Sequence, residues 1–261
     1  APALKRVSSR RQAGETYHTW LERLPVRFTI LSTLAILIGG IVQIIPTIMV
    51  DSNIPTISSV KPYTPLELEG RDLYIREGCV SCHSQMVRPF RSEVERYGEY
   101  AKAGEFVYDH PFLWGSKRTG PDLLRVGGKY SDSWHLNHMY DPQSTSSGSI
   151  MPAYQWLVRN RHDRSAGQDK MQAMVSMGVP YSAEEIESAF ESMDVQATQI
   201  EKNLYMDPEF ARSYEEQKSY AEESGAEFVE MRDREIVALI AYLQRLGTDI
   251  KVEGNTEVAS E

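Results

Sequence analysis

The chain has only two cysteines among its 261 residues, Cys79 and Cys82. This scarcity excludes a fold held together by several disulfides and a zinc site built from four thiolates. The sequence also lacks an internal repeat and any clear alternation of apolar and polar residues, so we expect helices and loops rather than strands. No phosphate-binding loop, carboxylate dyad or nucleophile with a neighbouring base stands out.

Charge is missing from one long stretch of the chain. Residues 28–50, which read FTILSTLAILIGGIVQIIPTIMV, contain no charged side chain. A helix of that length would be about 35 Å long, enough to cross a hydrocarbon core of roughly 30 Å. A signal sequence would have a shorter apolar core and a small-residue cleavage site, and neither is visible. The sequence therefore predicts a retained transmembrane helix, rather than a buried soluble helix or a cleaved leader.

The charges on either side of this helix predict its orientation. Residues 1–27 contain six basic and two acidic residues, a net charge of +4, whereas the whole chain carries −9 and residues 28–261 therefore carry −13. Positively charged flanks stay on the cytoplasmic side. We expect residues 1–27 in the cytoplasm and the large domain outside, which in a bacterium means the inner membrane with the domain in the periplasm.

Composition divides the rest of the chain into a linker, a domain and a tail. Residues 51–64 are rich in proline and polar residues and are typical of an extended linker. Residues 65–250 should form one mainly α domain with long loops and an acidic helical insertion at 160–230. Residues 251–261 remain as a C-terminal tail.

Helical spacing is clearest at the two ends of this domain. A first helix should begin near Pro65 and end before Gly78, and a last one should lie between Asp233 and Gly247. Between them, residues 181–235 contain 16 acidic and 5 basic residues, a net charge of −11. This charge could steer a basic electron donor or simply keep the surface soluble, and the sequence leaves both open.

Both cysteines belong to the string CVSCH, which ends at His83. A structural disulfide is possible outside the cytoplasm, a redox dithiol would need a βαβ context, and a zinc site would need further ligands. The C-x-x-C-H pattern matches covalent attachment of a c-type haem, with two thioether bonds and a histidine next to the second cysteine. We predict one haem c bound through Cys79 and Cys82, with His83 as the proximal iron ligand.

A second axial ligand should come from a distant part of the chain. Met86 is too close to His83 for the backbone to pass around a ring about 10 Å across. Met151, in the segment SGSIMPAY, is the preferred candidate because the proline directly after it makes this loop rigid and extended, so that it could present the thioether sulfur. The other candidates are Met139, His110, His135 and His138.

Histidine and methionine together predict the role of the iron. Methionine stabilises the ferrous state and raises the reduction potential. Since both axial positions would be filled, oxygen could not bind without displacing a ligand. The sequence therefore favours an electron carrier that is a poor catalyst of oxygen chemistry.

Three longer stretches resemble a known family. They are GRDLYIREGCVSCHSQMVRPFRSE, GPDLLRVGGKYSDSWHLNHMYDP and SIMPAYQWL. They are similar to the membrane-anchored mono-haem cytochrome c subunit of cbb3-type cytochrome c oxidases. The resemblance implies a cytochrome c-like α domain on one transmembrane helix, with Cys79, Cys82, His83 and Met151 as the haem residues.

The same resemblance implies that the chain is a non-catalytic subunit of an enzyme complex and turns over no substrate alone, and it also implies partners. They are a polytopic catalytic subunit with haem b and a haem–copper centre, and a di-haem cytochrome c subunit that, like a soluble cytochrome c, could supply electrons. The anchored cytochrome of a nitric oxide reductase and a haem-based gas sensor remain alternatives. We also hypothesise that Arg88, Tyr130 and Trp134 contact the haem propionates, since arginine forms charge-assisted bonds with carboxylates.

Overall fold

The computed structural model describes residues 10–50 and 55–251, and within them the fold is mainly α. These residues contain no strand, only an isolated bridge between Arg161 and Arg234. The expectation of a mainly α chain with one N-terminal helix of membrane length is confirmed. The chain divides into two units, Ala1–Pro55 and Thr56–Glu261. Residues of the expected tail beyond Lys251 lie outside the described part.

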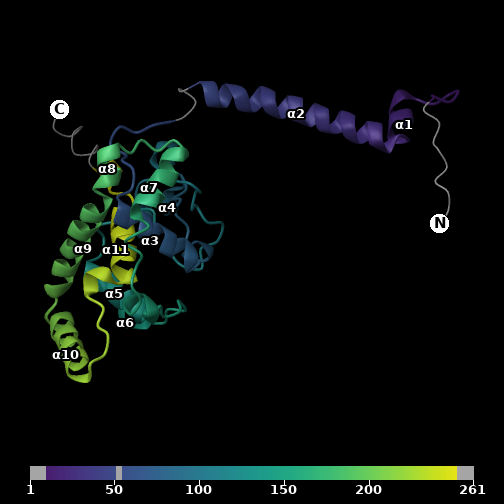
Figure 1. Cartoon of the computed structure of the whole chain (residues 1–261). Coiled ribbons are helices and arrows are strands. Elements are labelled where there is room, and N and C mark those ends of the chain that lie inside the picture. Colours follow the sequence, from purple (N-terminus) through teal and green to yellow (C-terminus); the bar gives the residue numbers. More distant parts are fainter. Residues whose placement is uncertain (1–9, 51–54, 252–261) are drawn as a thin grey trace, which may run out of the picture. The chain divides into compact units, whose positions relative to one another are not determined.

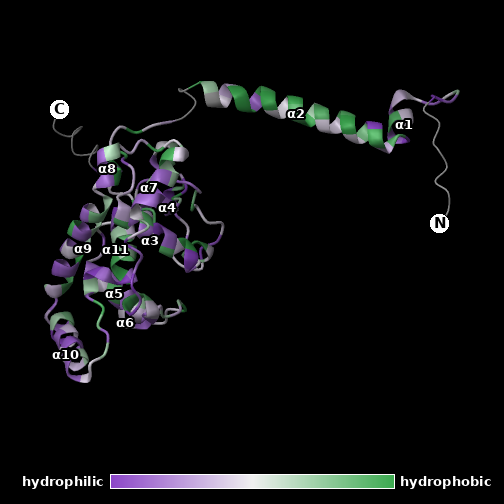
Figure 2. Cartoon of the chain, in the orientation of Figure 1, coloured by the Kyte–Doolittle hydropathy of each residue, from purple (hydrophilic) through white to green (hydrophobic). Residues whose placement is uncertain are grey.

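The first unit contains α1 (Tyr17–Glu22) and α2 (Pro25–Met49) (Figure 1). Pro25 occupies the first turn of α2, where its missing N–H costs no hydrogen bond, so the helix begins slightly before the uncharged stretch. Residues Pro25–Thr47 are long and apolar enough to cross a membrane, and none of this segment is buried within the protein. Figure 2 shows α2 as mostly hydrophobic along its length. An apolar helix with no buried residue along this segment suits a membrane anchor.

The second unit contains the remaining helices. Its α-helices are α3 (Pro65–Arg76), α4 (Arg91–Tyr97), α5 (Asp132–Tyr140), α6 (Pro142–Thr145), α7 (Gly167–Ser176), α8 (Ala183–Glu187), α9 (Ala189–Tyr205), α10 (Pro208–Ser224) and α11 (Glu235–Arg245). Short 3-10 helices lie at Cys79–Ser81, Ala103–Phe106, Gln155–Val158 and Met231–Asp233. The expected first and last helices of the domain are both present, as α3 and α11.

The core of the second unit is the crossing of α3 and α11. α3 begins with a capping box in which the Thr64 hydroxyl accepts from the Glu67 N–H and the Glu67 carboxylate accepts from the Thr64 N–H. α11 is buried along most of its length, and the Tyr74 and Tyr242 rings of the two helices meet with centroids 5.5 Å apart. Because α3 leads straight into the cysteine motif, this crossing determines where that motif begins.

The acidic insertion packs on this core. In α9 the buried side chains follow a helical spacing of three or four residues, at Met193, Ala197, Ile200 and Leu204, and they join the cluster formed by α3 and α11. Of the two glutamates of α9, Glu191 is exposed on the outer side of this amphipathic helix, and Glu201 is half-buried at the edge of its packed face. In Figure 2, α10 is largely hydrophilic, as expected for a surface helix.

Candidate haem-binding site

The cysteine motif forms a compact turn directly after α3. Gly78 adopts a left-handed backbone conformation (φ 72°), which glycine reaches without steric penalty. The turn is closed by the hydroxyl of Ser81, which donates to the Gly78 carbonyl at 2.6 Å, and by the N–H of His83, which donates to the Cys79 carbonyl at 2.9 Å. The two thiols and the imidazole are thus presented from one short segment.

The two thiols are not joined by a disulfide, and their surroundings do not suit a reactive dithiol. Cys79 is half-buried and Cys82 is exposed. Burial, followed by the charge of Glu77, raises the pKa of Cys79 to about 12, whereas reactive thiols have a lowered pKa. The described residues contain no group of three or more His, Cys, Asp or Glu side chains placed to hold a metal ion. Neither a redox dithiol nor a zinc site is supported.

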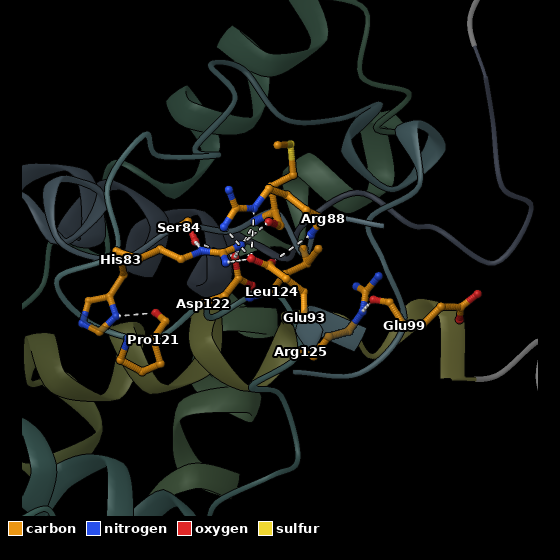
Figure 3. A network of polar contacts seen from close by, with 11 residues as sticks. His83, Ser84, Arg88, Glu93, Glu99, Pro121, Asp122, Leu124 and Arg125 are labelled. Atoms are coloured by element: carbon orange, nitrogen blue, oxygen red, sulfur yellow. Dashed lines mark hydrogen bonds and ion pairs between the residues drawn. The ribbon is translucent and has the colours of Figure 1, made fainter. Parts of the chain in front are cut away.

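The imidazole of His83 is oriented by a backbone carbonyl. Its Nδ1 atom lies 2.8 Å from the carbonyl oxygen of Pro121, as Figure 3 shows. A carbonyl only accepts hydrogen bonds, so Nδ1 carries the hydrogen and donates. Nε2 is then left with a lone pair, the form in which histidine binds a metal. These donors fit a c-type haem: two thiols for the thioether bonds and an imidazole already in the metal-binding tautomer.

Two glycines allow the chain to approach this imidazole closely. A Cβ atom on Gly120 would lie 2.3 Å from Cε1 of His83, and one on Gly115 would lie 2.8 Å from the His83 carbonyl oxygen. Real Cβ atoms do not approach other heavy atoms this closely, so neither site accepts a side chain without a shift of the histidine or its backbone.

Backbone hydrogen bonds tie the segment 82–86 to the segment 114–124. Gly120 donates to the Cys82 carbonyl at 2.9 Å, Leu123 donates to the Ser84 carbonyl at 2.8 Å, and Gln85 donates to the Trp114 carbonyl at 3.0 Å. These bonds lie on both sides of His83 in the sequence. They hold the imidazole and the Pro121 carbonyl in one fixed arrangement.

The carboxylate of Asp122 reinforces this arrangement. It accepts hydrogen bonds from the Ser84 hydroxyl at 2.6 Å and from the backbone N–H groups of Met86 and Leu124, both at 2.9 Å. Its side chain has no solvent exposure. A buried carboxylate with this many donors is well satisfied, and it stabilises the turn that carries Pro121.

Met151 lies in the loop between α6 and the 3-10 helix Gln155–Val158. It is half-buried, and its backbone N–H donates to the Ser149 hydroxyl at 3.2 Å. It packs against the main core cluster, as do Cys79 and Val80 of the haem motif. Met151 and the motif, far apart in sequence, therefore border the same apolar cluster.

The other candidate iron ligands have different surroundings. Met139 and His135 are buried in α5, with 8% and 2% of their surface exposed, and the His110 carbonyl accepts from Arg71 at 3.0 Å. The Nδ1 atom of His138 lies 2.6 Å from the Thr145 hydroxyl. Burial is the main cause that lowers the pKa of His138, and a positive charge on His83 would lower it further.

The predicted propionate contacts fall into two separate groups. Tyr130 and Trp134 stack with ring centroids 4.0 Å apart, and Trp134 stacks in turn on His138 at 4.6 Å, so the three rings form a column. Arg88 is not part of this column, and its guanidinium pairs with the Glu93 carboxylate at 2.5 Å. The structure thus brings Tyr130 and Trp134 together and gives Arg88 a carboxylate partner from α4.

The α5 helix that carries this column is held from two sides. The carboxylate of Asp132, in its first turn, accepts from the Asn203 side chain of α9 at 2.8 Å and from the Gln244 side chain of α11 at 2.6 Å. The acidic insertion therefore takes part in placing the aromatic column.

Sequence reasoning missed the residues that orient His83. Gly120, Pro121 and Asp122 form the run GPD, which lies 37–39 residues beyond the histidine. A Gly-Pro pair in a loop signals a tight turn, but its pairing with the cysteine motif is a long-range contact that no local pattern reveals.

Comparison with known proteins adds to this geometry. A family model described as "FixO: Cytochrome C oxidase, mono-heme subunit/FixO" matches residues 18–250, most of the chain. A search of curated proteins found no match.

Proposed function

Since this chain belongs to the FixO family of mono-haem cytochrome c oxidase subunits, we propose that it relays electrons within a cbb3-type haem–copper oxidase. The electrons would come from a di-haem cytochrome c subunit or a soluble cytochrome c and pass to the haem b of the catalytic subunit. When bound, haem c supplies a one-electron carrier. The chain's own residues hold it, orient its ligands and place it near its partners.

The contact between His83 Nδ1 and the Pro121 carbonyl is the observation that carries this proposal. It leaves Nε2 free to bind iron and makes the imidazole a stronger ligand, because the hydrogen bond adds electron density to the ring. Cys79 and Cys82 would form the two thioether bonds. The pattern C-x-x-C-H alone does not specify a tautomer, whereas this hydrogen bond does.

Met151 is proposed as the ligand on the other side of the iron. It borders the apolar cluster that Cys79 and Val80 also border, and an apolar setting suits a thioether sulfur. With both axial positions held by the protein, the iron would exchange electrons and bind no gas. Tyr130 and Trp134 are proposed propionate contacts, since the two rings stack as one rigid surface.

The membrane arrangement follows from α2 and the charges around it. We propose that residues 28–50 cross the bacterial inner membrane, that residues 1–27 stay in the cytoplasm, and that the domain 65–250 lies in the periplasm after the linker 51–64. The haem would then lie on the outer side of the membrane, where periplasmic donors can reach it.

A single preparation tests the proposal. The complex purified through a tag on this chain should contain a haem that survives denaturing electrophoresis on this polypeptide, and that haem should be lost in the double variant Cys79→Ala/Cys82→Ala. Its reduced spectrum should not change with carbon monoxide in the haem c band, and copper should co-purify. A partner with non-haem iron would indicate a nitric oxide reductase instead, and a haem c band that shifts with carbon monoxide would indicate a gas sensor.

A further inference from the structure

A network of charged side chains includes the residue directly after His83 and the residue directly after Pro121. It comprises Arg88, Glu93, Arg118 and Asp122 with the hydroxyl of Ser84, and we name it the proximal charge network; all of these except Arg118 are labelled in Figure 3. Arg118 contacts every other member except Arg88. Its Nε donates to the Ser84 hydroxyl at 2.6 Å, one terminal nitrogen contacts Asp122 at 3.3 Å, and the other pairs with Glu93.

Arg118 connects the two segments that fix the imidazole. On the side of the cysteine motif it bonds the Ser84 hydroxyl and the Met86 carbonyl, the latter at 2.8 Å. On the other side it contacts Asp122, the residue directly after the Pro121 whose carbonyl accepts from His83. One guanidinium thus holds the histidine loop and its hydrogen-bond acceptor in place.

The network is balanced in charge, and its members other than Arg88, which is 51% exposed, are shielded from solvent. Two arginines face two carboxylates, and Arg118 is only 19% exposed while Asp122 is fully buried. The bond to Arg118, followed by the bond to Arg88, lowers the pKa of Glu93 to about 2, so this carboxylate is ionised at neutral pH. The surface pair Arg91–Glu95, with side chains 91% and 62% exposed, shows the contrast. Solvent screens the charges of an exposed pair, whereas charges in the low-dielectric interior interact more strongly with other charges nearby.

We infer that the charges of Arg118 and Asp122 set the reduction potential of the iron held by His83. Ferric haem iron carries one more positive charge than ferrous iron, so a nearby carboxylate favours the ferric state and a nearby guanidinium favours the ferrous state. Asp122 therefore lowers the potential and Arg118 raises it. The inference rests on the proposed function, because it requires iron on His83.

The test is a spectroelectrochemical titration of the haem c band in the purified complex. Arg118→Gln should lower the midpoint potential and Asp122→Asn should raise it, each with at least a tenfold change in the reduction equilibrium constant, which is about 59 mV for one electron. Arg118→Lys retains the charge and should lie between Arg118→Gln and the parent.

Arg164→Gln is the matched control. Arg164 is also 19% exposed and also pairs with two carboxylates, Asp194 and Asp233, but these belong to the acidic insertion and its junction with α11. Its loss should leave the potential of the haem unchanged.

Opposite shifts distinguish charge from structure. If the network merely held the fold, both substitutions would loosen the site and shift the potential in the same direction. Shifts of equal sign, or shifts no larger than that of Arg164→Gln, overturn the inference. If the Arg118→Gln variant does not assemble into the complex, Glu93→Gln tests the inference instead. Removal of the Glu93 anion should raise the reduction potential, and an unchanged or lower potential overturns the inference.

The proposed function and this inference can fail separately. A parent chain without covalent haem on the denaturing gel removes the proposed function and the inference with it. A parent chain with haem, whose potential responds to none of the network substitutions, removes the inference alone.

Discussion

Gly70 in α3 crosses the backbone of Ala238 in α11 so closely that a Cβ atom on residue 70 would lie 1.9 Å from the Ala238 carbonyl oxygen. It would also lie 2.8 Å from Cβ of Tyr242. Backbone atoms inside a buried helix cannot yield to such a contact. The crossing that positions the start of the cysteine motif therefore depends on a missing side chain.

Gly70→Ala should destabilise the domain, even though alanine is the better helix former. Overpacking of a buried contact costs roughly 1–3 kcal/mol in free energy of unfolding, and a clash with backbone belongs at the upper end. Chemical denaturation followed by circular dichroism measures the loss. Gly39→Ala in α2, where a Cβ would meet nothing within 4 Å, is the control and should not destabilise. An unchanged midpoint for Gly70→Ala would contradict the close crossing.

Gly120→Ala should displace the imidazole of His83, because the new Cβ would lie 2.3 Å from its Cε1 atom. We expect either loss of covalent haem or an altered absorption spectrum of the ferrous protein, with reduced haem content per polypeptide. Gly40→Ala, at a position without neighbours within 4 Å, should leave haem content and spectrum as in the parent. A normal spectrum in Gly120→Ala would show that the ring does not pack here.

Met151→Leu should remove the sulfur ligand while nearly preserving side-chain volume, a change that usually costs less than about 1.5 kcal/mol in stability. The reduction potential should fall by more than about 59 mV, the equivalent of a tenfold change, and the ferrous haem should bind carbon monoxide. Met139→Leu and Met171→Leu, at buried methionines 8% and 1% exposed, are the controls. If Met139→Leu instead gives these changes, Met139 is the ligand.

Stability should depend on pH through His135. Burial, opposed by the charge of Asp132, lowers the pKa of His135 to about 4 from its ordinary value of 6.5. Above pH 6.5 the imidazole is neutral in both the folded and the unfolded chain. As the pH falls from 6.5 to 4, only the unfolded chain takes up the proton, so the folded state loses up to roughly 3 kcal/mol.

His135→Gln should remove that part of the pH dependence. The measurement is the free energy of unfolding between pH 4 and pH 7, with His18→Gln, at the 80% exposed side chain of α1, as the control. A parent and a His135→Gln variant that lose stability equally over this range would contradict a neutral, buried His135.

Arg88→Gln tests the propionate hypothesis against the observed ion pair with Glu93. If Arg88 neutralises a propionate, its loss lowers the reduction potential, and the decrease persists when Glu93 is already glutamine. If Arg88 acts through Glu93, the Arg88→Gln/Glu93→Gln double variant should have the same potential as Glu93→Gln alone, because the two substitutions are then coupled. We expect the decrease to persist. An unchanged potential in the single variant would exclude the propionate role.

The parts of this molecule that depend on local pattern were predictable. The uncharged stretch appears as α2, and the apolar spacing and caps near Pro65 and Gly247 appear as α3 and α11. The motif at Cys79, Cys82 and His83 indicated haem because its chemistry lies within five consecutive residues. Such features require only helical periodicity, backbone capping and short-range spacing.

Arg88 shows where that reasoning stops. Its position just past the motif suggested a contact with a haem propionate, and nothing local indicated its pairing with Glu93 and, through Glu93, with Arg118. The acidic stretch likewise indicated surface helices, but not that α9 contributes Ile200 and Leu204 to the main core cluster. The contact of Arg118 with Glu93 and the packing of α9 on α3 and α11 join residues that are far apart in the sequence, so no local pattern predicts them.

The sequence by itself determined that this chain carries an apolar helix of membrane length and a short C-x-x-C-H motif that predicts haem attachment, because each consists of consecutive residues. Only the tertiary structure decided that the Pro121 carbonyl orients His83, and that Arg118 and Asp122 connect the segments that carry these two residues. Those residues lie 35–39 positions beyond the histidine, and the fold alone brings them within hydrogen-bonding distance.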